Sequence, residues 1–189
     1  MGIILASQSP RRRQLLEMLG LDFVVIPAKG EEVIPSGMSP GDTVRLLSRQ
    51  KAAAVAAGAS PEDIVIAADT IVWHGGQVLG KPKNEQEAAR MLSALSGNTH
   101  QVYTGITVRK GETVLSGAEC TNVRFRKLSG HEIDAYIACG EPFDKAGGYG
   151  IQGVACLFVE GIEGDFFNVM GLPVCRMGKM LKELGVEIL

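Results

Sequence analysis

The sequence predicts an α/β fold, and three observations support that prediction. A short apolar run at residues 3–6 is followed at once by a capped helix start at Ser9 and Pro10. A second apolar run, residues 64–68, has the continuous hydrophobicity of a fully buried central strand. Further strand patterns alternate with helical periodicity along the rest of the chain. The 189 residues suffice for one sizeable domain or two closely joined lobes.

In its first half the chain alternates strands with helices. A serine followed by proline begins two helices, because proline has no N–H group to leave unpaired in the first turn. His74-Gly75-Gly76 predicts the turn of a hairpin between Ile71-Val72-Trp73 and Gln77-Val78-Leu79. The predicted strands are residues 3–6, 23–26, 64–68, 71–73 and 77–79, and the predicted helices are residues 10–19, 40–57 and 84–96.

The second half begins with two long antiparallel strands, residues 102–108 and 114–125, joined at Lys110-Gly111. Ser129 caps a helix that ends near residue 140. Residues 144–153 form a glycine-rich loop, which either lets backbone approach a ligand closely or merely connects elements. A strand at residues 157–160 and a helix at residues 172–184 follow.

Composition limits the classes of function. Apolar residues make up 46% and charged residues 21%, as in ordinary globular proteins. The net charge of -2 argues against a general nucleic-acid-binding surface. We expect no signal peptide, because the apolar run near residue 3 is short and is followed by arginines, and no apolar run approaches the length that spans a bilayer. The four cysteines form no C-x-x-C pair, so we expect buried or incidental thiols in a cytoplasmic protein. From the net charge and the lack of a long apolar run, we expect no nucleic-acid partner and no membrane partner.

Three consecutive arginines occupy the first turn of the first helix. Cations at Arg11, Arg12 and Arg13 oppose the helix macrodipole, each at a cost of about 0.3–1 kcal/mol. Free helix N–H groups, the hydroxyls of Ser7 and Ser9 and the guanidinium groups together suit a phosphate chain. The alternative is a solvated basic face. Successive helix residues point about 100° apart, so we expect Arg13 to lie outside the site.

Three further features are candidates for the same site. Asp69 and Thr70 follow the central apolar run, and ligands of open α/β sheets bind beyond the carboxyl ends of such strands. Lys51, within the predicted helix at residues 40–57, is a second candidate. An Asx-turn is the structural alternative for Asp69, and a solvated lysine is the alternative for Lys51. Residues 80–83, Gly-Lys-Pro-Lys, form a rigid turn with two cations, and its proline excludes a phosphate-binding P-loop.

Five separated motifs occur together in one order along nearly the whole chain. They are Ser7-x-Ser9-Pro10-Arg11-Arg12, Ala68-Asp69-Thr70, Gly80-Lys81-Pro82, Leu95-Ser96-Gly97 and Asp144-Lys145-Ala146-Gly147-x-Tyr149-Gly150-Ile151-Gln152. Together they resemble the Maf family of nucleoside triphosphate pyrophosphatases, which look like structural relatives of the inosine-triphosphate pyrophosphatases. The resemblance implies one domain over residues 1–189, with an elongated mixed β-sheet flanked by helices, two lobes and a central cleft. It also implies cleavage between the α- and β-phosphates, which gives nucleoside monophosphate and pyrophosphate.

The resemblance and the chemistry of the residues together indicate which side chains contact the charged groups of the substrate. The phosphate chain is expected to contact Ser7, Ser9, Arg11, Lys51, Lys81 and Lys145. A triphosphate also brings a hard divalent cation, Mg²⁺, Mn²⁺ or Co²⁺, which prefers oxygen ligands. Asp69 and Glu32 are the candidate ligands, and Glu32 corresponds to a loop glutamate of the family. Asp69 can act as general base or as metal ligand, and both roles stay open.

The resemblance also points to a substrate. Arg12, Thr70 and Gln152 match the branch of the family that acts on dTTP and UTP. A glutamine amide offers one donor and one acceptor, which can match half of the edge shared by uracil and thymine. Such enzymes are associated with removal of non-canonical pyrimidine nucleotides and with arrest of cell division. A homodimer is left open.

Two other classes of function compete with this one. The first is a nucleotide-binding regulator of septum formation that does not hydrolyse its ligand. The second is a phosphatase with Asp69 as covalent nucleophile, which would need a second carboxylate two residues on, where Ile71 stands. Release of pyrophosphate distinguishes the three.

Overall fold

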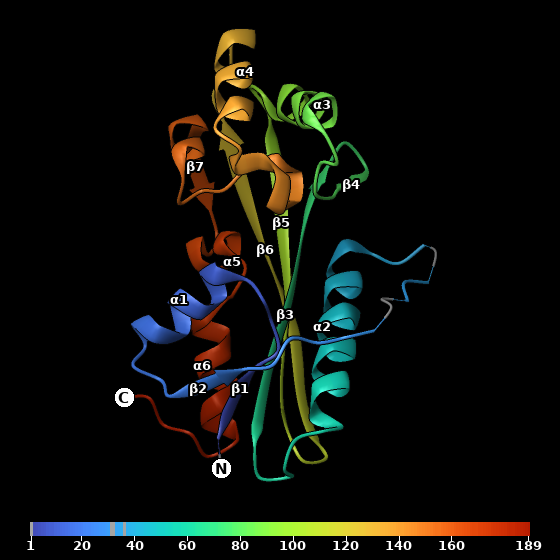
Figure 1. Ribbon diagram of the computed structural model, residues 1–189, viewed down its shortest axis with the longest axis vertical. Helices are drawn as coiled ribbons and strands as arrows, with labels where there is room; N and C mark the ends of the chain where they lie inside the picture. The colour runs from blue at the N-terminus through green and yellow to red at the C-terminus, as the bar shows by residue number, and fades with distance from the viewer. Residues whose placement is uncertain (1, 31–32, 36) are drawn as a thin grey trace. The chain divides into compact units, whose positions relative to one another are not determined.

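The computed structural model describes residues 2–30, 33–35 and 37–189. These residues form an α/β structure around a seven-stranded sheet in the order β2-β1-β3-β5-β6-β7, with β4 paired to β3 (Figure 1). The strands are β1 (Ile3–Leu5), β2 (Phe23–Val25), β3 (Ile64–His74), β4 (Gln77–Leu79), β5 (Thr99–Lys110), β6 (Thr113–Phe125) and β7 (Val159–Glu163). The helices are α1 (Pro10–Met18), α2 (Pro40–Ala56), α3 (Glu85–Leu95), α4 (Gly130–Ala138), α5 (Phe166–Met170) and α6 (Val174–Glu183), with 3-10 turns η1 (Glu141–Asp144), η2 (Ala146–Gly148) and η3 (Val154–Phe158).

Strand pairing makes the sheet mixed. Strand β1 runs parallel to β2 and β3, so that Ile4 lies opposite Val24 and Val65. The pairs β3–β4 and β6–β7 are antiparallel. The mixed α/β sheet flanked by helices is therefore confirmed.

The chain divides into two compact units. Unit 1 comprises residues 1–69, 104–119 and 171–189, and unit 2 comprises residues 70–103 and 120–170. Neither unit is a continuous stretch of chain, and three of the four boundaries fall inside the strands β3, β5 and β6. The two units correspond to the two lobes that the resemblance implies. That residues 1–189 form a single domain stays a prediction.

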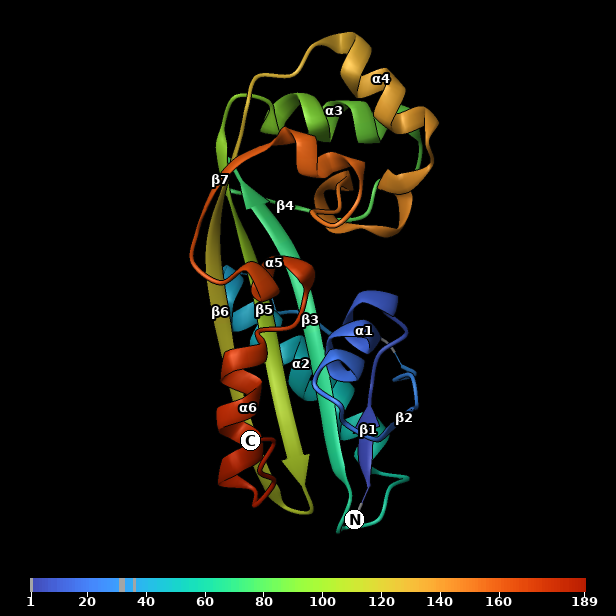
Figure 2. The ribbon, with the colours of Figure 1, turned by 90° about the vertical axis from the view of Figure 1, so that its left-hand side faces the viewer.

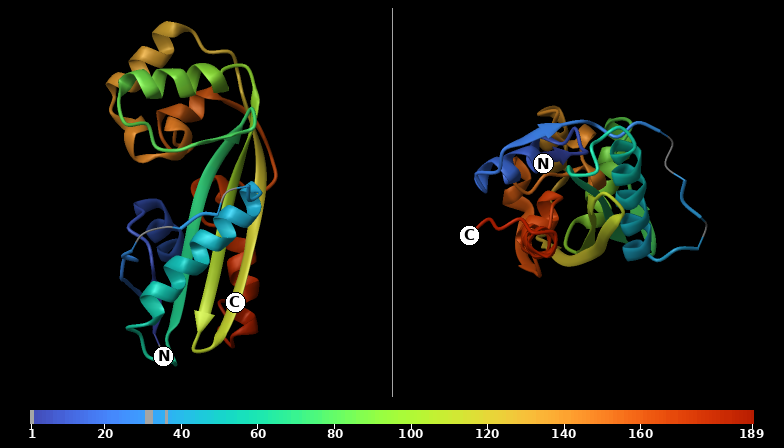
Figure 3. Two further views of the ribbon diagram at one scale, coloured as in Figure 1. Left: turned by 90° about the vertical axis from the view of Figure 1, so that its right-hand side faces the viewer. Right: turned by 90° about the horizontal axis from the view of Figure 1, so that it is seen from below.

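In unit 1, helix α2 packs against one face of the strands β1 and β3. The apolar side chains between them are small, which lets helix and sheet approach closely: Ile4, Ala6, Ala52, Val55, Val65 and Ala67. Helix α6 lies on the other side of the strands, as Figures 2 and 3 show. The strands of unit 1 are thus covered by helices on both faces, which explains the continuous apolar run at residues 64–68.

Gly105 fixes the position of α2. A Cβ atom at this residue of β5 would lie 2.0 Å from the carbonyl oxygen of Val44, in the first turns of α2. The backbones of helix and strand therefore touch, which only glycine permits. One turn further on, the buried hydroxyls of Ser48 and Thr107 are 2.8 Å apart and hydrogen-bonded. Helix α2 is consequently held on the sheet with its next turn, which carries Lys51, in a defined place.

Unit 2 has a core of its own, built on aromatic side chains. Phe125 makes edge-to-face contacts with the rings of Tyr149 and His100, at centroid distances of 4.8 and 5.0 Å. Nε2 of His100 and the hydroxyl of Tyr149 are 2.7 Å apart. Burial lowers the pKa of His100 to about 4, helped by the nearby charge of His74. The imidazole is therefore neutral at pH 7.

Some predicted features were wrong in detail. The central strand does not end at Ala68, because β3 continues to His74. Residues 154–158 form the 3-10 turn η3, and β7 begins at Val159 rather than two residues earlier. The four cysteines carry free thiols and are all exposed, which fits the incidental alternative of the prediction and not the buried one. No helix among the described residues is long and apolar enough to cross a membrane.

Candidate functional site

Asp69 lies inside β3, whereas the sequence predicted it at the end of a strand. Successive side chains of a strand point to opposite faces, so Val65, Ala67 and Asp69 share one row. Val65 and Ala67 pack against α2. The carboxylate of Asp69 therefore faces α2 as well, and only 14% of its side chain is exposed. Such a placement needs a compensating charge.

Lys51 supplies that charge from α2. Its ammonium group donates a hydrogen bond to Oδ1 of Asp69, and 21% of the lysine side chain is exposed. Lys51 precedes Ala52 and lies one turn before Val55, both of which belong to the buried face of the helix. The ion pair is thus positioned by the packing of α2 on the sheet. It brings together an acid and a cation that were predicted independently.

Ser7 and Arg12 form the second part of the site. The Nη1 group of Arg12 donates to the hydroxyl oxygen of Ser7 over 3.0 Å, and the backbone N–H of Ser9 donates to the same oxygen over 3.2 Å. Since that oxygen accepts two hydrogen bonds, its own O–H remains to donate to a further acceptor. Nε of Arg12 donates to the carbonyl of Gly171 over 2.7 Å. Burial lowers the pKa of Arg12, and the nearby Asp69 carboxylate opposes that shift.

Helix α1 begins as the sequence predicts, at Pro10 after Ser9. The side chain of Ser9 makes no capping hydrogen bond, which leaves its hydroxyl and the first N–H groups available to an anion. Arg11 lies in this first turn and is half-buried. Arg13 forms an exposed ion pair with Glu17 one turn later, at 2.7 Å. Arg13 therefore faces away from the site, as the helical spacing predicts.

In unit 2, two of the sequence motifs pack on each other. The N–H of Gly147 donates to the carbonyl of Gly80 over 2.9 Å. Gly147 has a φ of +70°, and a Cβ atom there would lie 2.9 Å from Cγ2 of Val72. Pro82 is buried, 3.5 Å from the position of a Cβ atom at Gly148. Glycine content in this loop thus serves close packing of the Gly80–Pro82 turn.

The remaining predicted residues of unit 2 have different surroundings. Lys81 is exposed, and so is Gln152, which lies in the turn before η3. Lys145 is held by its own unit, because its ammonium group donates to the carbonyl of Glu141 and to Oδ1 of Asp144, both over 2.6 Å. Two of its three donors are therefore already used. Thr70 follows Asp69 in β3 and is half-buried.

A divalent cation finds only part of its ligands among the described residues. Glu32 lies outside them. Within the ranges 2–30, 33–35 and 37–189, no three His, Cys, Asp or Glu side chains gather closely enough to hold a metal ion. The carboxylate of Asp69 contacts the ammonium group of Lys51 and lies near the guanidinium of Arg12.

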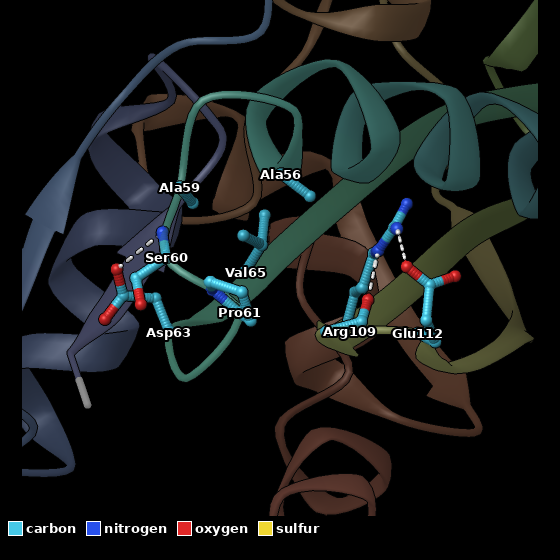
Figure 4. A pocket seen from close by; sticks show the side chains of 9 residues that line it. Ala56, Ala59, Ser60, Pro61, Asp63, Val65, Arg109 and Glu112 are labelled. Atoms are coloured by element: carbon cyan, nitrogen blue, oxygen red, sulfur yellow. Dashed lines mark hydrogen bonds and ion pairs between the residues drawn. The ribbon is translucent and has the colours of Figure 1, made fainter.

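A separate cavity of about 110 Å³ lies at the other end of β3 (Figure 4). Val65 lines it, together with Arg109, Asp63 and the end of α2. Its polar groups are bonded locally, since Asp63 accepts from the N–H of Ser60 and Arg109 donates to the carbonyl of Gly111. Val65 is four residues from Asp69, roughly 13 Å along an extended strand. This cavity is not part of the candidate site.

Three contributors were missed from the sequence. The carbonyl of Gly171 orients Arg12, and Tyr136 and Glu141 contact the loop that carries Gln152. The Gly171 contact joins residues 159 positions apart, and no local pattern encodes it. Glycine content marks the loop of Gln152, but it does not reveal which side chains hold it.

Comparison with known proteins identifies the family. A model of the Maf-like protein family matches residues 2–184. The chain belongs to the Maf family. Its relatives include a dTTP/UTP pyrophosphatase of Agathobacter rectalis, 50% identical over 98% of both chains. Another, a dTTP/UTP pyrophosphatase of Bacillus cereus, is 49% identical over 98% of this Maf protein and 97% of its own length.

A solved structure supports the fold. A HAM1 protein from Coxiella burnetii superposes with a TM-score of 0.51 at 15% sequence identity, over 97% of this Maf protein and 99% of its own chain. At that identity the likeness concerns the fold alone. It agrees with the mixed sheet of the described residues.

Proposed function

We propose that the protein hydrolyses nucleoside triphosphates, with preference for dTTP and UTP, to the monophosphate and pyrophosphate. The observation that carries this proposal is the grouping in unit 1 of Asp69 with Lys51 and Arg12, beside the start of α1. Membership of the Maf family and relatives that are named dTTP/UTP pyrophosphatases support it. Such a reaction belongs in the cytoplasm, where nucleotides are held.

The residues of unit 1 suit an attack of water on the α-phosphate. Water adds to phosphorus, the bond to the bridging oxygen breaks, and pyrophosphate leaves with the bonding electrons. Arg11 and the N–H groups of α1 can bind phosphate oxygens, and the Ser7 hydroxyl can donate to one. Asp69 can take the proton of the attacking water if its ion pair with Lys51 loosens around the substrate. Fixed positive charge then stabilises the transition state.

A divalent cation fits this site. Mg²⁺ is commonly held by one or two carboxylates together with substrate phosphates, and Asp69 provides one carboxylate among the described residues. Glu32 is the second ligand that we propose from the sequence. When bound, the cation neutralises charge on the phosphate oxygens.

The test is a product assay over a panel of nucleoside triphosphates with Mg²⁺, Mn²⁺ or Co²⁺. We expect pyrophosphate as the first product and loss of activity in excess chelator. Orthophosphate as the first product would indicate a phosphatase instead. Binding without turnover would favour the non-hydrolysing regulator. A sedimentation measurement on the same sample determines whether the active species is a homodimer.

Base recognition is assigned to Gln152, with Thr70 and Arg12 as further candidates. Arg12 is already bonded to Ser7 and Gly171, and Thr70 lies in the opposite row of β3 from Asp69. Gln152 is exposed in a glycine-rich turn and is the better test. In one orientation its amide can pair with the O4 and N3–H groups of uracil or thymine, whereas cytosine presents an amino group and an unprotonated N3 and would need the amide turned over.

Gln152→Ala is expected to reduce the preference for dTTP and UTP over CTP by roughly 10-fold or more, because unpaired polar groups on the base cost about 1–3 kcal/mol each. Inhibition by pyrophosphate, which has no base, should be unchanged. The measurement is kcat/KM for the three nucleotides. Equal activity of the wild-type protein on all four common ribonucleotides would refute the specificity and leave the pyrophosphatase activity standing.

A further inference from the structure

Two side chains of unit 2 form hydrogen bonds with the backbone of the loop that carries Gln152. The N–H of Gly150 donates to the hydroxyl oxygen of Tyr136 over 3.3 Å. The N–H of Val154 donates to Oε1 of Glu141 over 3.1 Å. These contacts lie two residues before and two residues after Gln152. They therefore fix both sides of the turn from which its amide projects.

The two side chains are themselves joined. The hydroxyl of Tyr136 donates to Oε2 of Glu141 over 3.1 Å. One phenol and one carboxylate thus form a continuous chain of three hydrogen bonds from Gly150 to Val154. We call the hydroxyl of Tyr136 and the carboxylate of Glu141 the Tyr136–Glu141 clasp.

The clasp rests on rigid parts of unit 2. Tyr136 lies in α4, is only 2% exposed, and its ring contacts Phe158 edge-to-face at a centroid distance of 5.1 Å. Burial and the adjacent Glu141 charge raise the pKa of Tyr136 above its usual value, so the phenol keeps the proton that it donates. Ser129 and Glu132 form a capping box that stabilises the start of α4.

Gly153 shows how closely the loop passes the carboxylate. A Cβ atom at this residue would lie 2.2 Å from Oε2 and 2.4 Å from Oε1 of Glu141. The φ of Gly153 is -98°, which any residue adopts, so a side chain here would be opposed by the Glu141 carboxylate, which would have to move. The backbone of the turn is therefore seated directly on Glu141.

We propose that the Tyr136–Glu141 clasp is a positioning device that sets the Gln152 amide for recognition of the pyrimidine base. Tyr136 and Glu141 bond to the backbone N–H groups of Gly150 and Val154, so in this proposal both act through the position of Gln152. The inference rests on the proposed function and adds to it two specificity-determining residues. A clasp that only stabilised the fold would affect all substrates alike, and that difference makes the inference testable.

Tyr136→Phe is the cleanest test, because it removes one hydroxyl and keeps the buried ring. We expect kcat/KM for dTTP and UTP to fall by roughly 3- to 10-fold, the range for one lost hydrogen bond, while kcat/KM for CTP stays within about twofold. Amide hydrogen exchange in a peptide spanning residues 149–156 should become faster. Glu141→Gln keeps one carbonyl acceptor for Val154 and should lose less selectivity than Glu141→Ala.

Tyr149→Phe serves as the matched control. It deletes another buried phenol of unit 2, one residue before Gly150, but that hydroxyl contacts His100 and not the turn at residues 150–154. Its selectivity should equal that of the wild type. An equal fall for dTTP and CTP in Tyr136→Phe, or the same selectivity change in both tyrosine variants, would overturn the inference.

The outcomes also separate the clasp from the proposed function. If the wild-type protein has no pyrophosphatase activity, the proposed function is wrong. If it has no preference for dTTP over CTP, the proposed specificity is wrong. In either case the clasp has no role in base recognition. If the wild-type protein prefers dTTP, and this preference is lost in Gln152→Ala but kept in Tyr136→Phe and Glu141→Ala, the inference about the clasp is wrong and the proposed function stands.

Discussion

Asp69→Asn is expected to lower kcat by at least about 10²-fold, the scale on which loss of a general base acts. The amide keeps the shape of the side chain but can neither take a proton nor balance the charge of Lys51, whose ammonium contacts Oδ1. Because the pair is mostly buried between α2 and β3, we also expect a loss of stability of roughly 1–3 kcal/mol. Steady-state turnover of dTTP and urea unfolding measure the two effects.

Asp63→Asn is the control for this variant. Asp63 lies just before the other end of β3, where it accepts hydrogen bonds from the N–H groups of Gly2 and Ser60. It should leave turnover unchanged. A folded Asp69→Asn protein with near-normal kcat would show that the carboxylate has a structural role only. Restoration of its activity by excess Mn²⁺ would identify Asp69 as a metal ligand rather than the base.

Gly105→Ala should destabilise the protein by about 3 kcal/mol, the upper part of the range for overpacked sites. The added methyl group would lie 2.0 Å from the carbonyl oxygen of Val44 and 2.6 Å from the backbone nitrogen of Arg45, so α2 must move. Its displacement also shifts Lys51 away from Asp69. Turnover measured well below the unfolding transition should therefore fall as well. Urea unfolding gives the change in midpoint at constant slope.

Gly178→Ala provides the comparison. Gly178 lies in α6 of the same unit with open space around its Cβ position, and alanine favours a helix over glycine by about 1 kcal/mol. This variant should be as stable as the wild type or more so. If Gly105→Ala unfolds at the same urea concentration as Gly178→Ala, the close contact of α2 with β5 does not exist.

Much of the architecture could be predicted from local chemistry. Ser39 caps α2 and Asn84 caps α3, because their oxygens accept the N–H groups of Asp42 and Glu87. The hairpin turn at residues 75–76 has positive φ at both glycines, as the dipeptide predicts. Such signals lie within a few residues of what they specify, and a single sequence displays them.

The remainder depends on contacts between distant parts of the chain. An acid at Asp69 predicts the end of a strand, yet β3 continues past it, and Lys51 on α2 compensates its charge. The hydroxyl of Ser7 was assigned to phosphate, yet it also orients Arg12. Gly105 carried no signal, since its role is defined by the backbone of Val44. In each case the partner is chosen by packing and not by spacing.

The contact between Arg12 and Gly171 has a consequence for biosynthesis. The guanidinium of Arg12 donates to the carbonyl of Gly171, which the ribosome synthesises 159 residues later. Everything that forms unit 2 lies between residues 70 and 170, so that unit is complete on the ribosome while unit 1 still lacks α6. The growing chain therefore carries its acid and arginines for most of its translation before the site that holds them can form.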